Sequence, residues 1–105
     1  MKSIQVTALE KQVLEALAKG MYAEWHYSDM GIAEIAEDTG LDRKVIRGVA
    51  GSLRKKGLID IDDRADEGYR NQPDMHIWYL TEKTEGLVEH WVEEEGLEPV
   101  QLITV

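Results

Sequence analysis

The sequence of 105 residues contains no cysteine, and this absence excludes a disulfide framework, a thiolate metal site and a cysteine nucleophile. It has only two prolines and no compositional repeats, which argues against a disordered or linker-rich chain. No apolar run approaches the ~20 residues of a membrane-spanning helix, and the first residues lack the apolar stretch of a signal peptide. We therefore expect one cytoplasmic, soluble domain over residues 1–105, with a single hydrophobic core.

Basic residues are also scarce, and half of them lie together. The chain has 12 lysines and arginines against 21 aspartates and glutamates, which gives a net charge of −9. Six of the 12 lie between Arg43 and Lys56, a segment without any acidic residue. The rest of the chain therefore carries six basic and 21 acidic residues. Such a segment can attract an anion locally while the remaining surface repels it.

A first helix is predicted near the start of the chain. Thr7 and Glu10 have the spacing of a capping box, in which each side chain accepts a hydrogen bond from the other residue's backbone. The apolar residues that follow recur at helical intervals. This pattern predicts a helix over about residues 8–19 that ends at Gly20.

Two further helices are predicted to cross steeply around a tight turn. The first covers about residues 31–38, and Gly40 permits the left-handed backbone of the turn. Asp42 can cap the next helix, which extends to about residue 56. The apolar residues predicted on the buried side of this third helix are Val45, Ile46, Val49 and Leu53. Its exposed side then carries the basic residues, as docking into a DNA major groove requires.

A hairpin and a fourth helix are predicted next. Two strand-like runs, at residues 58–63 and 75–80, flank a polar segment with the composition of a hairpin loop. Thr81 can cap a fourth helix over about residues 82–95, with apolar residues along one stripe. Residues 3–7 and 100–105 are strand-like as well. They could pair with each other, pair across a dimer, or fray.

The sequence resembles the winged helix-turn-helix module of MarR-like prokaryotic transcription regulators. The resemblance begins at residues 31–60, GIAEIAEDTGLDRKVIRGVAGSLRKKGLID. It continues at residues 78–87, WYLTEKTEGL, which are similar to the strand that leaves the wing and the start of the next helix. Over a core of about residues 8–95, it implies an α+β winged helix with a three-helix core, a two-stranded wing hairpin and a C-terminal fourth helix.

The resemblance also implies a function, namely sequence-specific binding of duplex DNA by a homodimer that regulates transcription by occupying an operator. Nine residues are candidates for contact with DNA. Base edges would be contacted by Arg43, Lys44 and Arg47. Phosphates would be contacted by Ser52, Arg54, Lys55 and Lys56. The tip of the wing would contribute Arg64 and Arg70.

Two glycines on the exposed side of the third helix have two interpretations. Gly48 and Gly51 each cost a helix ~1 kcal/mol relative to alanine. They either permit close approach of a ligand to the backbone or are tolerated because tertiary packing stabilises the helix.

The acidic residues support an alternative function. Asp42 stands where the family usually has serine or threonine, and aspartates and glutamates flank the wing. The chain could therefore be a protein–protein interaction module, either a complex subunit or an inhibitor, that does not bind DNA. Its contact surface would be the acidic wing and the fourth helix.

Enzymatic and metal-binding functions are not expected. The sequence has no glycine-rich phosphate loop, no nucleophile elbow and no convincing pair of acid and base. No two of its three histidines have the spacing of metal ligands, and adjacent carboxylates such as Asp62 and Asp63 are typical of a solvated surface. We expect no catalytic residues, no metal and no cofactor.

Overall fold

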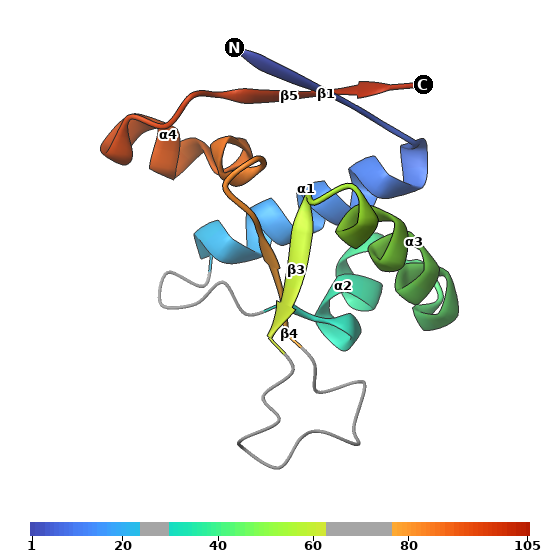
Figure 1. Cartoon of the computed structure of the whole chain (residues 1–105). Coiled ribbons are helices and arrows are strands. Elements are labelled where there is room, and N and C mark those ends of the chain that lie inside the picture. The colour runs from blue at the N-terminus through green and yellow to red at the C-terminus, as the bar shows by residue number, and fades with distance from the viewer. Residues whose placement is uncertain (24–29, 63–76) are drawn as a thin grey trace.

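The computed structural model describes residues 1–23, 30–62 and 77–105 of the chain (Figure 1). Both helices and strands occur along it. In chain order they are β1 (Lys2–Val6), α1 (Ala8–Ala23), β2 (Met30–Gly31), α2 (Ile32–Thr39), α3 (Arg43–Lys55), β3 (Ile59–Asp62), β4 (Ile77–Leu80), the 3₁₀ helix η3 (Glu85–Leu87), α4 (Glu89–Glu95) and β5 (Val100–Thr104).

The hydrophobic core lies between α1, α2, α3 and the hairpin of β3 and β4. Apolar residues at helical spacing bring one face of each helix into it. Its fully buried helical residues include Val13, Leu14, Leu17, Ile35, Ile46, Ala50 and Leu53. The hairpin contributes the nearly buried side chains of Leu58, Ile59, Trp78 and Leu80. The predicted order of three helices, a hairpin and further helix is confirmed in outline.

A three-stranded antiparallel sheet includes the hairpin. β3 pairs with β4, and β2 adds a third strand on the other side of β4. The strand β2 was not predicted, because two residues are too few to show a strand pattern. This arrangement of helices and a small antiparallel sheet is compatible with a winged helix. The predicted wing tip, with Arg64 and Arg70, lies outside the described residues.

The prediction that α1 ends at Gly20 is wrong, because the helix continues to Ala23. A glycine favours the end of a helix where the backbone turns left-handed. Among the described glycines, positive φ occurs at Gly40, Gly57 and Gly96. Gly20 is therefore accommodated within the helix, at a propensity cost of ~1 kcal/mol.

The predicted continuous fourth helix is also wrong. A turn and η3 occupy residues 81–87, Val88 is extended and buried, and only then does α4 begin. The reason lies in two threonines, which bond to the hairpin instead of capping a helix. The hydroxyl of Thr81 donates to the Gly57 carbonyl, and that of Thr84 to the Leu58 carbonyl, both at 2.7 Å. The apolar stripe predicted for this segment is nevertheless present in part, because Val88 is buried and Leu87 and Trp91 pack against the core.

The two ends of the chain form a separate, parallel two-stranded sheet, β1 with β5. Of the arrangements predicted for these segments, the structure shows pairing within the chain. Figure 1 shows the sheet as an outer layer above α1. It lies tightly against η3, because a Cβ at Gly86 would collide with the Glu98 carbonyl oxygen and lie 2.9 Å from Cγ2 of Val100. Only glycine fits at this position without a shift of the backbone.

We expect Gly86→Ala to destabilise the protein by about 2 kcal/mol, because the added methyl group forces η3 and the β5 segment apart. Urea unfolding monitored by circular dichroism measures this change. The matched control is Gly51→Ala in α3, where a Cβ has no atom of the described residues within 4 Å. That control should be up to ~1 kcal/mol more stable than the wild type. Equal stability of the two variants would contradict the close packing at Gly86.

Candidate nucleic-acid interface

A tight turn sets the angle between α2 and α3. The Gly40 N–H donates to the Ala36 carbonyl at 2.9 Å, and Gly40 itself has φ of +77°. The hydroxyl of Thr39 donates to the Ile35 carbonyl at 2.7 Å and accepts from the Leu41 N–H at 3.2 Å. The turn is therefore held by both backbone and side chain, and the glycine predicted for its left-handed position is confirmed.

The helix α3 begins directly after Asp42, as predicted. Asp42 has the extended backbone of an N-cap (φ −66°, ψ 142°). Within the described part of the chain, however, its side chain makes no capping hydrogen bond. Its carboxylate still lies next to the positive end of the helix dipole.

One side of α3 is buried and the other is exposed. Ile46, Ala50 and Leu53 face the core. The prediction that Val45 is buried with them is wrong, since 39% of it is exposed. Val45 lies about 100° around the helix from Ile46, and the packing of α3 turns Ile46 into the core and leaves Val45 at its edge. Val45 thereby joins the exposed face, where sequence reasoning did not place it.

The three residues predicted to contact base edges lie on this exposed face. Arg43, Lys44 and Arg47 are exposed residues of the first two turns of α3. Lys55 is exposed in the last turn. Arg54 forms an ion pair with Asp60 of β3, in which Nη2 and Oδ1 are 3.5 Å apart and both side chains are about half exposed. Such an exposed pair contributes little to stability and leaves Arg54 able to exchange partners.

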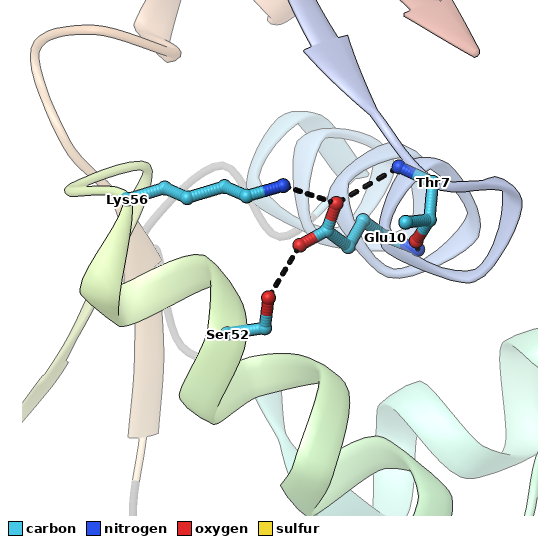
Figure 2. A network of polar contacts seen from close by, with 4 residues as sticks. All are labelled: Thr7, Glu10, Ser52 and Lys56. Carbon is cyan, nitrogen blue, oxygen red and sulfur yellow. Dashed lines mark hydrogen bonds and ion pairs between the residues drawn. The ribbon is translucent and has the colours of Figure 1, made fainter. Parts of the chain in front are cut away.

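Two residues predicted to contact phosphate are instead bonded to α1. Figure 2 shows the Glu10 carboxylate between Thr7, Ser52 and Lys56. Oε2 accepts from the Ser52 hydroxyl at 2.7 Å, and Oε1 accepts from Nζ of Lys56 at 2.7 Å. Oε1 also accepts from the Thr7 N–H at 2.8 Å, and the Glu10 N–H donates to the Thr7 hydroxyl at 3.1 Å. The predicted capping box is confirmed, and it also joins α1 to the end of α3.

Glu10 is charged although it is buried. Only 3% of its side chain is exposed, whereas 43% of the Lys56 side chain is. Burial disfavours the charged form, but the hydrogen bonds from Lys56, Thr7 and Ser52 and the charge of Lys56 outweigh this effect. Together they hold the pKa of Glu10 below its ordinary value.

The acidic surface of the alternative function was predicted on the wing and the fourth helix; most of the wing lies outside the described residues, and α4 carries the described part. Its glutamates Glu89, Glu93, Glu94 and Glu95 are exposed. Nε2 of His90 lies 2.9 Å from Oε2 of Glu94, one helical turn away, and a protonated histidine makes this contact an ion pair. Among the described residues, no group of three or more histidines and carboxylates is placed to hold a metal ion. Nor is any described helix long and apolar enough to span a membrane.

A groove of about 810 Å³ lies between α1, α4 and β5. Its walls mix basic side chains, such as Lys11 and Lys19, with carboxylates such as Glu15 and Glu93. Leu102 of β5 contributes apolar surface. This groove lies on the part of the molecule away from the exposed face of α3, since its lining includes no residue of α2 or α3.

Comparison with known proteins shows a likeness of fold. No family model matches the sequence, and no curated protein matches it. Among solved structures, Bordetella bronchiseptica BpsR, whose DNA binding is regulated by 6-hydroxynicotinic acid, is similar with a TM-score of 0.58 and 24% sequence identity. The match covers 84% of this chain and 58% of that one, so this chain corresponds to little more than half of BpsR. The likeness shows that the two share a fold.

The Glu10 network generates a prediction about stability and pH. Glu10→Gln should destabilise the protein by about 2 kcal/mol, because the charge-assisted bonds to Lys56 and Ser52 are lost or weakened. Since folding lowers the pKa of Glu10, the carboxylate contributes its full stability above the ordinary value of 4.5 and loses it as the pH falls through the lower folded value. The stability difference between wild type and variant should therefore shrink below about pH 4.5.

Urea unfolding between pH 3 and pH 7 measures this difference. The matched control is Glu15→Gln, which changes an exposed glutamate of the same helix and should leave stability within ±0.5 kcal/mol of wild type, an order-of-magnitude bound. A Glu10→Gln variant as stable as this control at pH 7 would show that the network contributes nothing.

Proposed function

We propose that residues 1–105 form one winged helix-turn-helix domain of the MarR-like kind, which binds duplex DNA and regulates transcription in the cytoplasm by occupying an operator. The observation that carries this proposal is the exposed face of α3. It presents Arg43, Lys44 and Arg47 on a helix without acidic residues, in a protein of net charge −9. The fold shared with BpsR, a protein whose DNA binding is regulated, supports it.

In this proposal the first two turns of α3 enter the major groove. Arginine and lysine there donate to the acceptor atoms of guanine. Val45 supplies an exposed apolar side chain between them, suited to contact with the methyl group of thymine. The resulting mixture of donors and one apolar group gives the helix a means to distinguish base pairs.

The phosphate contacts in this proposal are fewer than the sequence suggested. Lys55 and Arg54 remain as exposed cations at the end of α3. Ser52 and Lys56 are bonded to Glu10, so their first role in the proposal is to hold α3 against α1. Arg64 and Arg70 stay candidates for the wing.

The two glycines of α3 fit close contact with DNA. A Cβ at Gly48 or Gly51 would have no atom of the described residues within 4 Å. Internal packing therefore does not demand glycine at either position, although each costs the helix ~1 kcal/mol. Close approach of a sugar–phosphate backbone to the helix supplies a reason for both.

A second candidate function is the acidic protein-interaction module. The exposed glutamates of α4, a helix whose residues are all at least partly exposed, favour it. In this case a partner with a basic surface would bind α4 and the acidic wing, and the protein would not bind DNA. The same binding experiment separates the two functions.

Binding to duplex DNA should depend on α3 in two distinguishable ways. Arg47→Ala should cost about 1–3 kcal/mol against the preferred sequence, because a base contact is lost. Lys55→Ala should weaken all sequences alike and reduce the slope of log K against log salt by about one, because a phosphate contact is lost. Fluorescence anisotropy at several salt concentrations, first with random duplex and then with a selected site, measures both.

The decisive comparison uses a triple variant with Arg43, Lys44 and Arg47 changed to alanine. It should lose salt-sensitive binding while its circular dichroism and melting remain those of a folded protein. If the wild type does not bind duplex DNA at low salt, the protein-interaction function takes precedence. A triple variant that binds as well as wild type would show that α3 is not the DNA-binding helix.

Gly48→Ala provides a test in which stability and binding change in opposite directions. The variant should be up to ~1 kcal/mol more stable, because alanine favours the helix. It should nevertheless bind DNA more weakly, because the added methyl group prevents the closest approach to the backbone. Thermal melting and anisotropy measure the two effects, and a stabilised variant with unchanged affinity would contradict close contact at this position.

A further inference from the structure

The sheet of β1 and β5 has an unusual degree of exposure. Parallel sheets in proteins are mostly covered on both faces. Here Ile4, Val6 and Leu102 pack toward the core, but the opposite face is open. On that face Ile103 is 41% exposed, and Val105, directly after the strand, is 76% exposed. Two strands alone also form only a marginal sheet.

The free edge of β5 carries backbone groups without a strand partner. The Lys2 N–H donates to the Pro99 carbonyl, and the Val105 N–H donates to the Val6 carbonyl. In a parallel pair with this register, Gln101, Ile103 and Val105 direct their backbone groups toward β1. Val100, Leu102 and Thr104 direct theirs to the other side. Among the described strands β5 has β1 as its neighbour, and the groove beside α1 and α4 borders the strand at Val100, Gln101 and Leu102.

The composition of the free edge of β5 favours a second copy of the same chain as its binding partner. Two molecules of net charge −9 repel each other over most of their surfaces. Residues 100–105, VQLITV, contain no ionisable side chain, so the side chains of two β5 strands can meet without like charges among them. Edge strands of monomeric proteins are commonly protected by lysine, proline or a bulge. No lysine or proline lies within β5.

We propose that β5 pairs antiparallel with β5 of a second copy, around a two-fold axis, and that this pairing forms the dimer. The inference rests on the proposed function in one respect, since a symmetric DNA site calls for a two-fold dimer. The product is a four-stranded sheet in the order β1, β5, β5 and β1. It pairs the open backbone edge of each molecule and brings the exposed residues of the two outer faces together.

The geometry fixes the register of this pairing. The residues with outward backbone groups must lie opposite one another, so Leu102 lies opposite its own copy and Val100 lies opposite Thr104 of the second copy. It follows that Gln101 lies opposite Ile103 of the second copy, in a pair whose side chains are close on the exposed face. By symmetry, the pair of Val100 with Thr104 and the pair of Gln101 with Ile103 each occur twice in the dimer.

Charged substitutions at this pair test the register directly. In the variant Gln101→Glu with Ile103→Glu, like charges lie opposite each other, and the dimer dissociation constant should rise by about tenfold or more. In the variant Gln101→Lys with Ile103→Glu, opposite charges face each other, and the constant should stay within about threefold of wild type. Sedimentation equilibrium of the full chain over a range of concentrations measures the constants.

A matched control separates the local contact from the added net charge. Ser3→Glu with Gln5→Glu adds the same two charges on the exposed face of β1, next to Gln101 and Ile103 in the same sheet but one strand away from the partner. This control should dimerise nearly as well as wild type. Circular dichroism verifies that every variant is folded.

Three outcomes would overturn the inference: a wild-type protein that is monomeric at every concentration, a double-glutamate variant that dimerises like wild type, or a lysine–glutamate variant as weak as the double-glutamate one. Its failure is distinguishable from failure of the proposed function, because these variants leave α3 unchanged. A monomeric double-glutamate variant should still bind random duplex DNA in a salt-sensitive way. A wild type that dimerises as described but does not bind DNA would refute the proposed function and leave the dimer intact.

Discussion

The buried carboxylate of Glu10 connects the parts of the molecule on which the exposed basic face depends. It lies at the first turn of α1 and accepts hydrogen bonds from Ser52 and Lys56 at the end of α3. An ionised group inside a protein is stable only when its partners replace the water that it has lost. The orientation of α3 relative to α1 therefore depends on the hydrogen bonds that the Glu10 carboxylate accepts from Ser52 and Lys56. Lys56 neutralises the charge of this carboxylate from the α3 side while remaining partly in water.

The hairpin is held to the same end of α3 by a second set of polar contacts. The chain leaves α3 through Gly57, whose φ of +73° reverses its direction. The Thr81 and Thr84 hydroxyls then bond to the carbonyls of Gly57 and Leu58, so the segment after β4 is fastened to the segment before β3. Side-chain hydroxyls that satisfy backbone carbonyls in this way compete with regular helix formation. The same contacts explain why no long helix begins at Thr81.

Local patterns predicted much of this structure, and contacts between distant residues account for most of the differences. Thr7 and Glu10 are three residues apart, so their capping box was visible in the sequence. The bonds from Glu10 to residues 42 and 46 positions away were not, and with them the internal roles of Ser52 and Lys56. Val45 and Ile46 are both apolar neighbours, and only tertiary packing decides which one is buried. The basic face of α3 could be located because charge of one sign in a continuous segment needs no knowledge of distant contacts.

The pairing of β1 with β5 has a consequence for how the protein acquires its fold. The paired residues Lys2 and Val100 are separated by nearly the whole chain. Closing so long a loop costs conformational entropy before any strand contact repays it, and parallel pairing of this kind is slow. During synthesis, β1 has no strand partner until residues 100–104 have been made. The helices and the hairpin can assemble from more local contacts in the meantime, so the β1–β5 sheet completes a structure in which α3 and its exposed basic face are already in place.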